Sequence, residues 1–533
     1  MNKMILNPKR ISKIKKRRTF AIISHPDSGK TTITEKLLLL GKVIHTAGTI
    51  KSKKSKKYTR SDWMEIEKKR GISVNTSIMQ FSYLKHHINL LDTPGHEDFS
   101  EDTYRVLTAV DFCLMIIDGS KSVESRTKKL VKVARIKKIP IITFINKIDR
   151  NTYDFIKILD DIEKKLKISC TPITWPIGCG NFFKGIYDIY KNNISFYIKC
   201  FHKKEHVKNL ILDRKNIFLR KYLNKNEILK LIEDIDLIKS CYSIFNRKKF
   251  LKGKETPVFF GSALNNFGID DVLKKLILWG PYPQKRYSLT RKILPTEKFF
   301  SGFVFKIQAN MNPKHHDRIA FLRIVSGKYK EGIKLFHVRL KKNKIIKNAI
   351  NFIAGQRYLI KKAYPGDVIG IHSRGEIRIG DTFTEGELIN FIEIPKIASE
   401  RFKIIYLKNS LQQKKLLRGL IQLSEEGVVN FFKPFIDNFL ILGVIGELQF
   451  DVVLERLKEE YRVIAKYKDT DISVVRWISS ADTEILENFK RENYSSLAYD
   501  SNNELIFFTS SVFRLNLIIN KYKNINFSKI RKY

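Results

Sequence analysis

The sequence is poor in cysteine, glycine, proline and acidic residues, and it lacks any long apolar run. Its 533 residues include only five cysteines and no CxxC pair, so neither a zinc knuckle nor a disulfide framework is supported. Sparse, unpaired cysteines fit a reducing cytosol, and we expect a cytoplasmic protein. No run of about 18 apolar residues occurs, which excludes a predicted membrane span. Gly 26 and Pro 14 are few for this length, and no repeats are evident.

Basic residues outnumber acidic ones. The sequence has 100 Lys and Arg residues and 54 Asp and Glu residues, which gives a formal net charge of +46. Such a chain is more soluble and compact beside a polyanion, and a ribosome is the largest candidate. Drift toward codons rich in A and T, which enriches Lys, Ile, Asn and Phe, is the alternative that we favour for most of the excess. Hydrophobic residues at 43% and aromatics at 11% exclude intrinsic disorder. Charge alone does not decide the function.

Residues 1–18 hold eight basic side chains and no acidic one. This composition is similar to that of an organelle transit peptide. A strand expected to begin at Thr19 and a weak apolar face favour a short basic N-terminal extension instead.

Length predicts about three or four domains, and the pattern along the chain gives three. Residues 19–283 alternate continuous apolar runs with helical patterns, which indicates a mostly parallel sheet covered on both faces. We expect strands at residues 19–24, 88–92, 112–118, 140–146 and 258–260, and helices at 30–41, 97–108, 122–137 and about 268–279. The Lys-rich, weakly periodic stretch of about 178–255 is interpreted as an insertion in this domain.

The pattern changes after Gly280-Pro-Tyr-Pro283, and residues 284–298 are interpreted as a linker. Short β runs with glycine turns over residues 299–388 predict a β-barrel domain. Helices and strands mix again over residues 389–533, which predicts an α+β domain. The expected fold class is therefore α/β followed by β followed by α+β.

A phosphate-binding loop follows the first predicted strand and opens the first predicted helix, which is the context of a P-loop. Lys30 would reach the β- and γ-phosphates of a nucleotide, and Thr31 would bind Mg²⁺. The loop comprises Ser24, His25, Pro26, Asp27, Ser28, Gly29, Lys30 and Thr31. The strict pattern begins with glycine and Ser24 departs from it, so an ordinary loop with a surface lysine is the alternative for this motif alone.

A second motif lies at the end of another apolar strand, and it comprises Asp92, Thr93, Pro94, Gly95 and His96. Asp92 can hold Mg²⁺, through a water molecule in our interpretation. The backbone N–H of Gly95 can contact a γ-phosphate, since glycine lets the backbone approach closely.

Two more motifs select the base. The first comprises Asn146, Lys147, Ile148 and Asp149 at a strand end, and the second comprises Ser262, Ala263 and Leu264 after the last strand. The Asp149 carboxylate can accept from the two N–H groups on the edge of guanine, a pair that adenine does not offer. Asn146 would brace the P-loop, Lys147 would cover the base, and the last turn could donate backbone N–H groups to the guanine oxygen. Together the four motifs predict a P-loop GTPase domain that binds GTP or GDP with Mg²⁺.

In this order the motifs resemble those of the translational GTPases. His96 directly after Asp-Thr-Pro-Gly is the mark of that family. The resemblance implies that His96 positions the attacking water once the large-subunit RNA of a ribosome orders it. A solvent-facing turn histidine is the alternative. Arg70-Gly-Ile-Ser73 resembles the first switch of the family, which implies that the Ser73 hydroxyl binds Mg²⁺ and contacts the γ-phosphate.

Within this family the chain is similar to the class II release factors of bacteria. The similarity lies in residues 18–32, 61–65, 80–81, 170–179, 302–311 and 422–427, and it is weakest near 200–255. It implies a ribosome-stimulated GTP hydrolase that promotes dissociation of the codon-reading release factor after peptide release, without reading stop codons. The implied partners are ribosomal RNA and proteins at the GTPase-activating region of the large subunit, and functionally the codon-reading release factors. We expect a monomer with no membrane association.

Other functions remain open at this point. Residues 446–451 resemble the third domain of translocating elongation factors, but a translocase needs two more domains than the sequence after about residue 460 can supply. A ribosome-rescue GTPase is a further alternative. So is a ribosome-bound module that binds GTP without turnover, although the intact His96 disfavours it.

Overall fold

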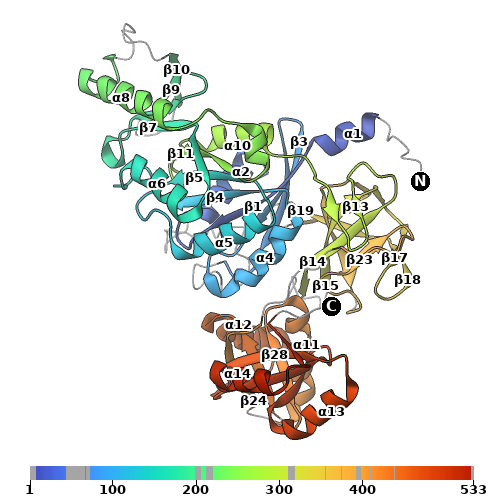
Figure 1. Ribbon diagram of the computed structural model, residues 1–533. Helices are drawn as coiled ribbons and strands as arrows, with labels where there is room; N and C mark the ends of the chain where they lie inside the picture. The colour runs from blue at the N-terminus through green and yellow to red at the C-terminus, as the bar shows by residue number, and fades with distance from the viewer. Residues whose placement is uncertain are drawn as a thin grey trace.

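The computed structural model describes residues 8–43, 67, 73–197, 206–211, 220–309, 318–353, 356–373, 375–391, 398–407, 410–436 and 439–529 (Figure 1). Segment 61–65 falls wholly outside the described residues, and several others fall partly outside them, among them 178–255, 302–311, 1–18 and 70–73. Of the last, only Ser73 is described. Among the described residues, no helix is long and apolar enough to cross a membrane.

The first domain is built on a seven-stranded sheet with the order β2-β3-β1-β4-β5-β11-β6. Its strands are β1 (Arg17–Ser24), β2 (Ser77–Tyr83), β3 (His86–Asp92), β4 (Phe112–Asp118), β5 (Ile141–Asn146), β6 (Ser169–Pro172) and β11 (Glu255–Phe260). Only β2 pairs antiparallel, with β3, and every other pairing is parallel. All residues of β1, β4 and β5 are buried, which explains why these strands read as continuous apolar runs.

Helices cover both faces of this sheet, as expected. One core joins the sheet to α4 (Ser100–Ala109), α5 (Ser125–Ile136) and α6 (Phe155–Leu166). A second core joins the opposite face to α2 (Lys30–Leu40) and α10 (Ile269–Trp279). Successive residues of β1 divide between the two cores, with Ala21 in the first and Phe20 and Ile22 in the second.

The structure differs from the expected elements in several places, and β2, β6 and α6 were not predicted. β1 begins at Arg17 rather than Thr19, and a helix, α1 (Pro8–Lys15), precedes it. The stretch of about 178–255 holds regular elements: β8 (Gly185–Asp188), β9 (Asn193–Tyr197), β10 (His206–Ile211), α8 (Lys225–Cys241) and α9 (Arg247–Leu251). With β7 (Thr174–Ile177) the strands form an antiparallel sheet in the order β10-β9-β8-β7. A capping box of Asn224 and Glu227 begins α8.

The second domain is a curled antiparallel sheet in the order β18-β17-β23-β14-β15-β22-β19-β20. Its strands are β14 (Ser301–Ala309), β15 (Arg318–Ser326), β17 (Ile333–His337), β18 (Lys342–Ile346), β19 (Ala349–Ile353), β20 (Gln356–Ile360), β22 (Val368–Ser373) and β23 (Thr382–Thr384). Short pairs link β12 (Arg286–Tyr287) to β13 (Lys292–Ile293) and β16 (Tyr329–Lys330) to β21 (Lys362–Ala363). The expected all-β domain is confirmed.

In its described residues, the C-terminal domain combines an antiparallel sheet with four α-helices, which confirms the α+β expectation. The sheet order is β27-β24-β26-β25-β29-β30-β28-β31. Its strands are β24 (Arg401–Leu407), β25 (Asn430–Pro434), β26 (Leu440–Val444), β27 (Ala465–Asp469), β28 (Val474–Ser479), β29 (Leu497–Asp500), β30 (Leu505–Thr509) and β31 (Asn526–Ser528). The helices are α11 (Gln413–Glu426), α12 (Glu447–Tyr461), α13 (Thr483–Glu492) and α14 (Val512–Lys521).

Polar contacts join the first domain to the other two. Asp102 in α4 accepts from Lys306 Nζ in β14 at 3.0 Å, and Arg105 in α4 donates to the backbone oxygen of Glu426 in α11 at 3.1 Å. Helix α4 therefore contacts both later domains directly.

Candidate functional site

Four of the predicted motifs meet at one edge of the first sheet, because parallel strands present their carboxyl ends together. Ser24, Asp92, Asn146 and Phe260 are the last residues of β1, β3, β5 and β11. A cavity of about 350 Å³ lies at this edge, within the usual range for ligand sites. Its lining includes these predicted residues: His25, Pro26, Asp27, Gly29, Lys30, Thr31, Ser73, Gly95, His96, Asn146, Lys147, Asp149, Ala263 and Leu264.

The remaining predicted residues are buried and are not among those that line the cavity. Thr93 donates its hydroxyl to the backbone oxygen of Ile22 at 2.6 Å, and Ile148 donates its backbone N–H to Gly261 at 3.3 Å. The backbone oxygen of Pro94 accepts from buried Arg126 at 3.0 Å. Ser24, Ser28, Asp92 and Ser262 are also buried outside the lining. These residues shape the loops that carry the lining groups.

The loop between β1 and α2 has the backbone of a phosphate cradle. Asp27 and Gly29 have φ angles of 61° and 91°, in the left-handed region, and α2 begins directly after Gly29. A Cβ at Gly29 would overlap Asn146 Nδ2, so both the conformation and the close approach require glycine. The hydroxyl oxygens of Ser24 and Ser28 are buried without a hydrogen-bond partner in the described protein. Such orphaned groups fit a loop shaped for a polar ligand.

A buried ion pair links the first two motifs. Lys30 Nζ lies 2.6 Å from Asp92 Oδ1, and the two side chains are 6% and 2% exposed. Burying two charges is tolerable because each compensates the other. The pair brings the two charged groups expected to hold phosphate and Mg²⁺ to one place.

Asn146 connects the P-loop to the turn at 261–264. Its Nδ2 donates to the backbone oxygen of Ser28 at 2.7 Å, and its Oδ1 accepts from the backbone N–H of Ala263 at 2.9 Å. Both hydrogen bonds are buried. One amide side chain thus fixes the distance between the phosphate end and the base end of the cavity.

Lys147 is held at the base end by Asp118, the last residue of β4. Its Nζ lies 2.6 Å from Asp118 Oδ2. Burial acts to raise the pKa of Asp118, but hydrogen bonds from Lys147 and Ser120 outweigh it and lower that pKa below its ordinary value. The charged pair fixes the lysine stem along the cavity wall.

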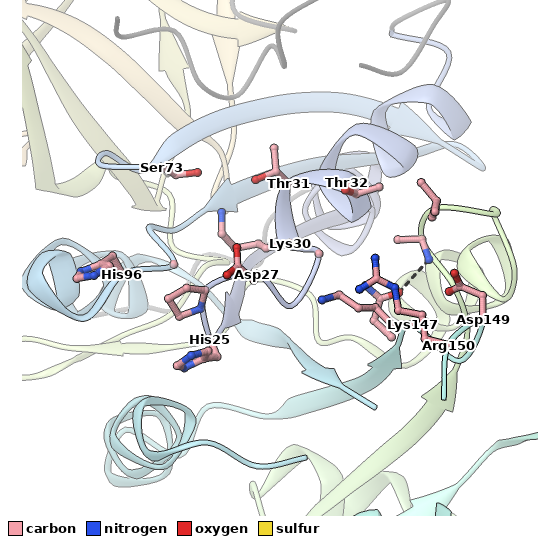
Figure 2. Close-up of a pocket in the computed structure, with 16 residues that line it drawn as sticks. His25, Asp27, Lys30, Thr31, Thr32, Ser73, His96, Lys147, Asp149 and Arg150 are labelled. Atoms are coloured by element: carbon pink, nitrogen blue, oxygen red, sulfur yellow. Dashed lines mark hydrogen bonds between the residues drawn. The ribbon is translucent and has the colours of Figure 1, made fainter. Parts of the chain in front are cut away.

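His96 lies at the other end of the cavity from Lys147 and Asp149 (Figure 2). It precedes a 3₁₀ helix, Glu97–Phe99, and its side chain is 33% exposed. Its Nδ1 lies 3.3 Å from both the backbone N and the Oδ1 of Asp98. The imidazole is therefore held at one nitrogen, and it lines the cavity.

Several residues of the site were not predicted from the sequence. Thr32 and Arg150 line the cavity, each directly after a predicted motif, and that adjacency was the only available signal. His25 Nε2 lies 2.6 Å from Glu124 Oε2. Burial lowers the pKa of His25 despite this carboxylate. Nothing in the sequence pairs the two residues.

The predicted metal-binding residues offer few oxygen atoms, so a cation held there would need further ligands from a bound nucleotide or water. Thr31 and Ser73 offer hydroxyl oxygens and Asp92 a carboxylate, the oxygen donors that Mg²⁺ prefers. Figure 2 shows Thr31 and Ser73 on the same side of the cavity. In the part of the chain that the structure describes, no group of three or more His, Cys, Asp or Glu side chains could hold a metal.

Comparison with known proteins agrees with this geometry. The family model for the elongation factor Tu GTP binding domain matches residues 15–281, and that for elongation factor G domain 2 matches residues 299–386. The model for the class II release factor RF3 C-terminal domain matches residues 391–519. Peptide chain release factor 3 of Buchnera aphidicola subsp. Schizaphis graminum (strain Sg) is 58% identical over 97% of this chain and 98% of its own. The chain belongs to the peptide chain release factor 3 family.

Other relatives support the same assignment. Peptide chain release factor 3 proteins of Buchnera aphidicola subsp. Acyrthosiphon pisum (strain 5A) and subsp. Baizongia pistaciae (strain Bp) are 56% and 54% identical, each over 97% of this chain and 98% of the relative. A crystal structure from Thermus thermophilus matches with a TM-score of 0.68 and 20% identity, covering 87% of this chain and 71% of that one, and shows the fold alone. The predicted membership of the class II release factors is confirmed, and the protein is a GTP hydrolase of translation termination.

Proposed function

We propose that this protein binds GTP with Mg²⁺ in the cavity at the edge of the first sheet and hydrolyses the GTP when the protein is bound to a ribosome. Its GTP form would drive the codon-reading release factor off the ribosome after peptide release, without itself reading stop codons. The observation that carries the proposal is the convergence of all four predicted motifs on one cavity whose ends have different chemistry.

The phosphate end rests on Lys30 and the P-loop. The Lys30–Asp92 pair can separate when substrate binds, because phosphate oxygens can replace the carboxylate beside Lys30 and a cation can replace the ammonium near Asp92. Charge is balanced in both arrangements. Thr31, Ser73 and Asp92, the last through water, are the residues that would hold Mg²⁺. That ion would supply charge neutralisation between the phosphates.

The base end rests on Asp149, with Lys147 and the turn at 261–264 around it. Asp149 lines the cavity, and its carboxylate is an acceptor for the two N–H groups on the edge of guanine. The turn at 261–264 would supply a backbone N–H for the guanine oxygen, apart from that of Ala263, which donates to Asn146 Oδ1. Hydrogen-bonded recognition of this kind discriminates strongly, because a wrong base leaves buried polar groups unpaired.

Hydrolysis would depend on His96. We assign it the positioning of the attacking water rather than simple proton abstraction, because phosphoryl transfer needs mainly orientation and charge stabilisation. Its partial exposure leaves the imidazole accessible to ribosomal RNA, which would order it. Helix α4 follows His96 and contacts both later domains, so loss of the γ-phosphate would release their arrangement and let the protein leave the ribosome.

Single-turnover GTP hydrolysis with and without bacterial ribosomes tests the proposal. We expect ribosomes to raise the rate, and His96→Ala to abolish most of that increase while GTP affinity in the absence of ribosomes is retained. Equal losses of hydrolysis and GTP binding in His96→Ala would contradict the role assigned to His96. A rate that does not respond to ribosomes would contradict the proposed dependence.

A further inference from the structure

A contact between the first and the C-terminal domain lies two residues from His96. Asp98 Oδ2 accepts from the backbone N–H of Leu448 at 2.8 Å. Leu448 is in the first turn of α12, where backbone N–H groups lack partners within the helix and the helix dipole favours a negative charge. The Asp98 carboxylate therefore acts as a cap supplied by another domain, across 350 residues of sequence.

Gly446, directly before α12, is shaped for this contact. Its φ and ψ angles are −137° and 159°, an extended conformation that any residue can adopt. A Cβ there would nevertheless overlap the Asp98 carboxyl carbon and both of its oxygens. The position thus accommodates glycine because Asp98 approaches so closely, not because of the backbone angles.

The same carboxylate faces the imidazole of His96. The two contacts at Nδ1 require opposite proton positions, since an unprotonated Nδ1 accepts from the Asp98 backbone N–H and a protonated Nδ1 donates to Asp98 Oδ1. With Oδ2 occupied by Leu448, the carboxylate is fixed in rotation and Oδ1 stays beside the ring. The contact of α12 with Asp98 therefore acts on the orientation of the His96 ring.

We propose that Asp98 is a positioning residue for His96, and that its contact with Gly446 and Leu448 couples docking of the C-terminal domain to the catalytic geometry. This proposal rests on the proposed role of His96. A ribosome that shifts the C-terminal domain would act on the imidazole through this contact. The first and C-terminal domains are then coupled through the Asp98 carboxylate as well as through the packing of α4.

The experiment is single-turnover GTP hydrolysis by the full-length protein over a series of ribosome concentrations, with GTP affinity measured separately. We expect Asp98→Ala and Gly446→Ala each to lower the rate at saturating ribosomes by about ten- to a hundredfold, the cost of a small misplacement of a catalytic group. GTP affinity and the ribosome concentration for half-maximal rate should not change. Asp98→Asn, which keeps an oxygen acceptor for the Leu448 N–H, should restore part of the rate.

Glu97→Ala is the matched control. Glu97 is the neighbouring carboxylate on the same 3₁₀ helix, and it pairs with exposed Lys129 instead of the C-terminal domain. Its rate should equal that of the parent. A rate for Asp98→Ala that matches the control, or a loss explained entirely by weaker ribosome or GTP binding, would overturn the proposal.

A double-mutant cycle tests the steric argument directly. Asp98→Ala removes the atoms that a Cβ at position 446 would overlap, so adding Gly446→Ala to it should cause no further loss. If the rate loss of the double variant equals the product of the two single-variant losses, the proposed coupling is overturned. His96→Ala in the same assay separates the two hypotheses. If it keeps the parental rate, the proposed function of His96 fails; if it loses the rate while Asp98 and Gly446 variants do not, only the positioning proposal fails.

Discussion

Replacing Asn146 by alanine tests whether the two ends of the cavity are held together by this one side chain. The change removes two buried hydrogen bonds and leaves the Ser28 carbonyl and the Ala263 N–H without their partners. Each unpaired buried backbone group costs about 1–3 kcal/mol, so the two together cost about 2–6 kcal/mol where water cannot reach them.

Bound nucleotide determines how much of this free-energy cost is measured as lost affinity. Asn146 lines the cavity, so in the empty variant water can enter the space that the amide leaves and pair with both backbone groups, and a bound nucleotide would exclude that water. We therefore expect about half of the cost, about 1–3 kcal/mol, to be seen as lost affinity, which is about 5- to 150-fold in Kd. Titration with a fluorescent GDP analogue measures this loss.

Asn89→Ala is the matched control for Asn146→Ala. Asn89 is an equally buried asparagine of the same sheet, on β3, and it donates to Thr19 Oγ1 at 3.2 Å and to the Gly366 backbone oxygen at 3.3 Å. Its loss should lower thermal stability without changing GDP affinity. If Asn146→Ala binds GDP as tightly as the parent, or if both variants lose affinity equally, the bracing role of Asn146 is refuted.

Three further predictions follow from charged groups. Asp149→Asn should lose affinity for GTP and gain affinity for xanthosine triphosphate, whose ring has a carbonyl where guanine has an amine; competition binding measures both, and unchanged preference would contradict the assignment. Lys306→Met removes the cation that pairs with Asp102 between the first two domains and should cost about 3–5 kcal/mol in urea unfolding. Burial acts to raise the pKa of Asp102, but Lys306 and a hydrogen bond from Thr76 lower it below its ordinary value. That stabilisation is therefore present above the unfolded pKa of about 4 and lost as pH falls through the folded pKa, so Asp102→Asn should flatten the acid side of the stability profile.

The site was largely predictable because its chemistry is local in sequence. Lys30 and Thr31 follow Gly29 within one turn, and Asn146 ends β5 with Asp149 in the turn directly after it, so the motif and its structural context coincide. Parallel strands then bring separate motifs to one edge without further information. The alternating layers of the first domain were predictable for the same reason, since its strands are buried on both faces.

The remaining features could not be predicted for two reasons. Some are contacts between residues far apart in the sequence, and others are helices and strands whose apolar periodicity is obscured by many lysines. Nothing near Asp98 indicates that Leu448 will meet it, and nothing near Arg126 indicates the carbonyl of Pro94. The regular structure between residues 178 and 255 was missed because dense lysines weaken the apolar period. Only Leu231, Ile235 and Ile238 of α8 are buried, which is a narrow stripe on a helix of 17 residues.

Dissociation of a labelled codon-reading release factor from post-termination ribosomes is the most direct measurement of the central proposal. The full-length protein with GTP should accelerate that dissociation, and the protein with GDP should not. It should cause no peptide release of its own on ribosomes stalled at a stop codon. A dissociation rate that is the same with and without the GTP-bound protein would contradict the proposed function.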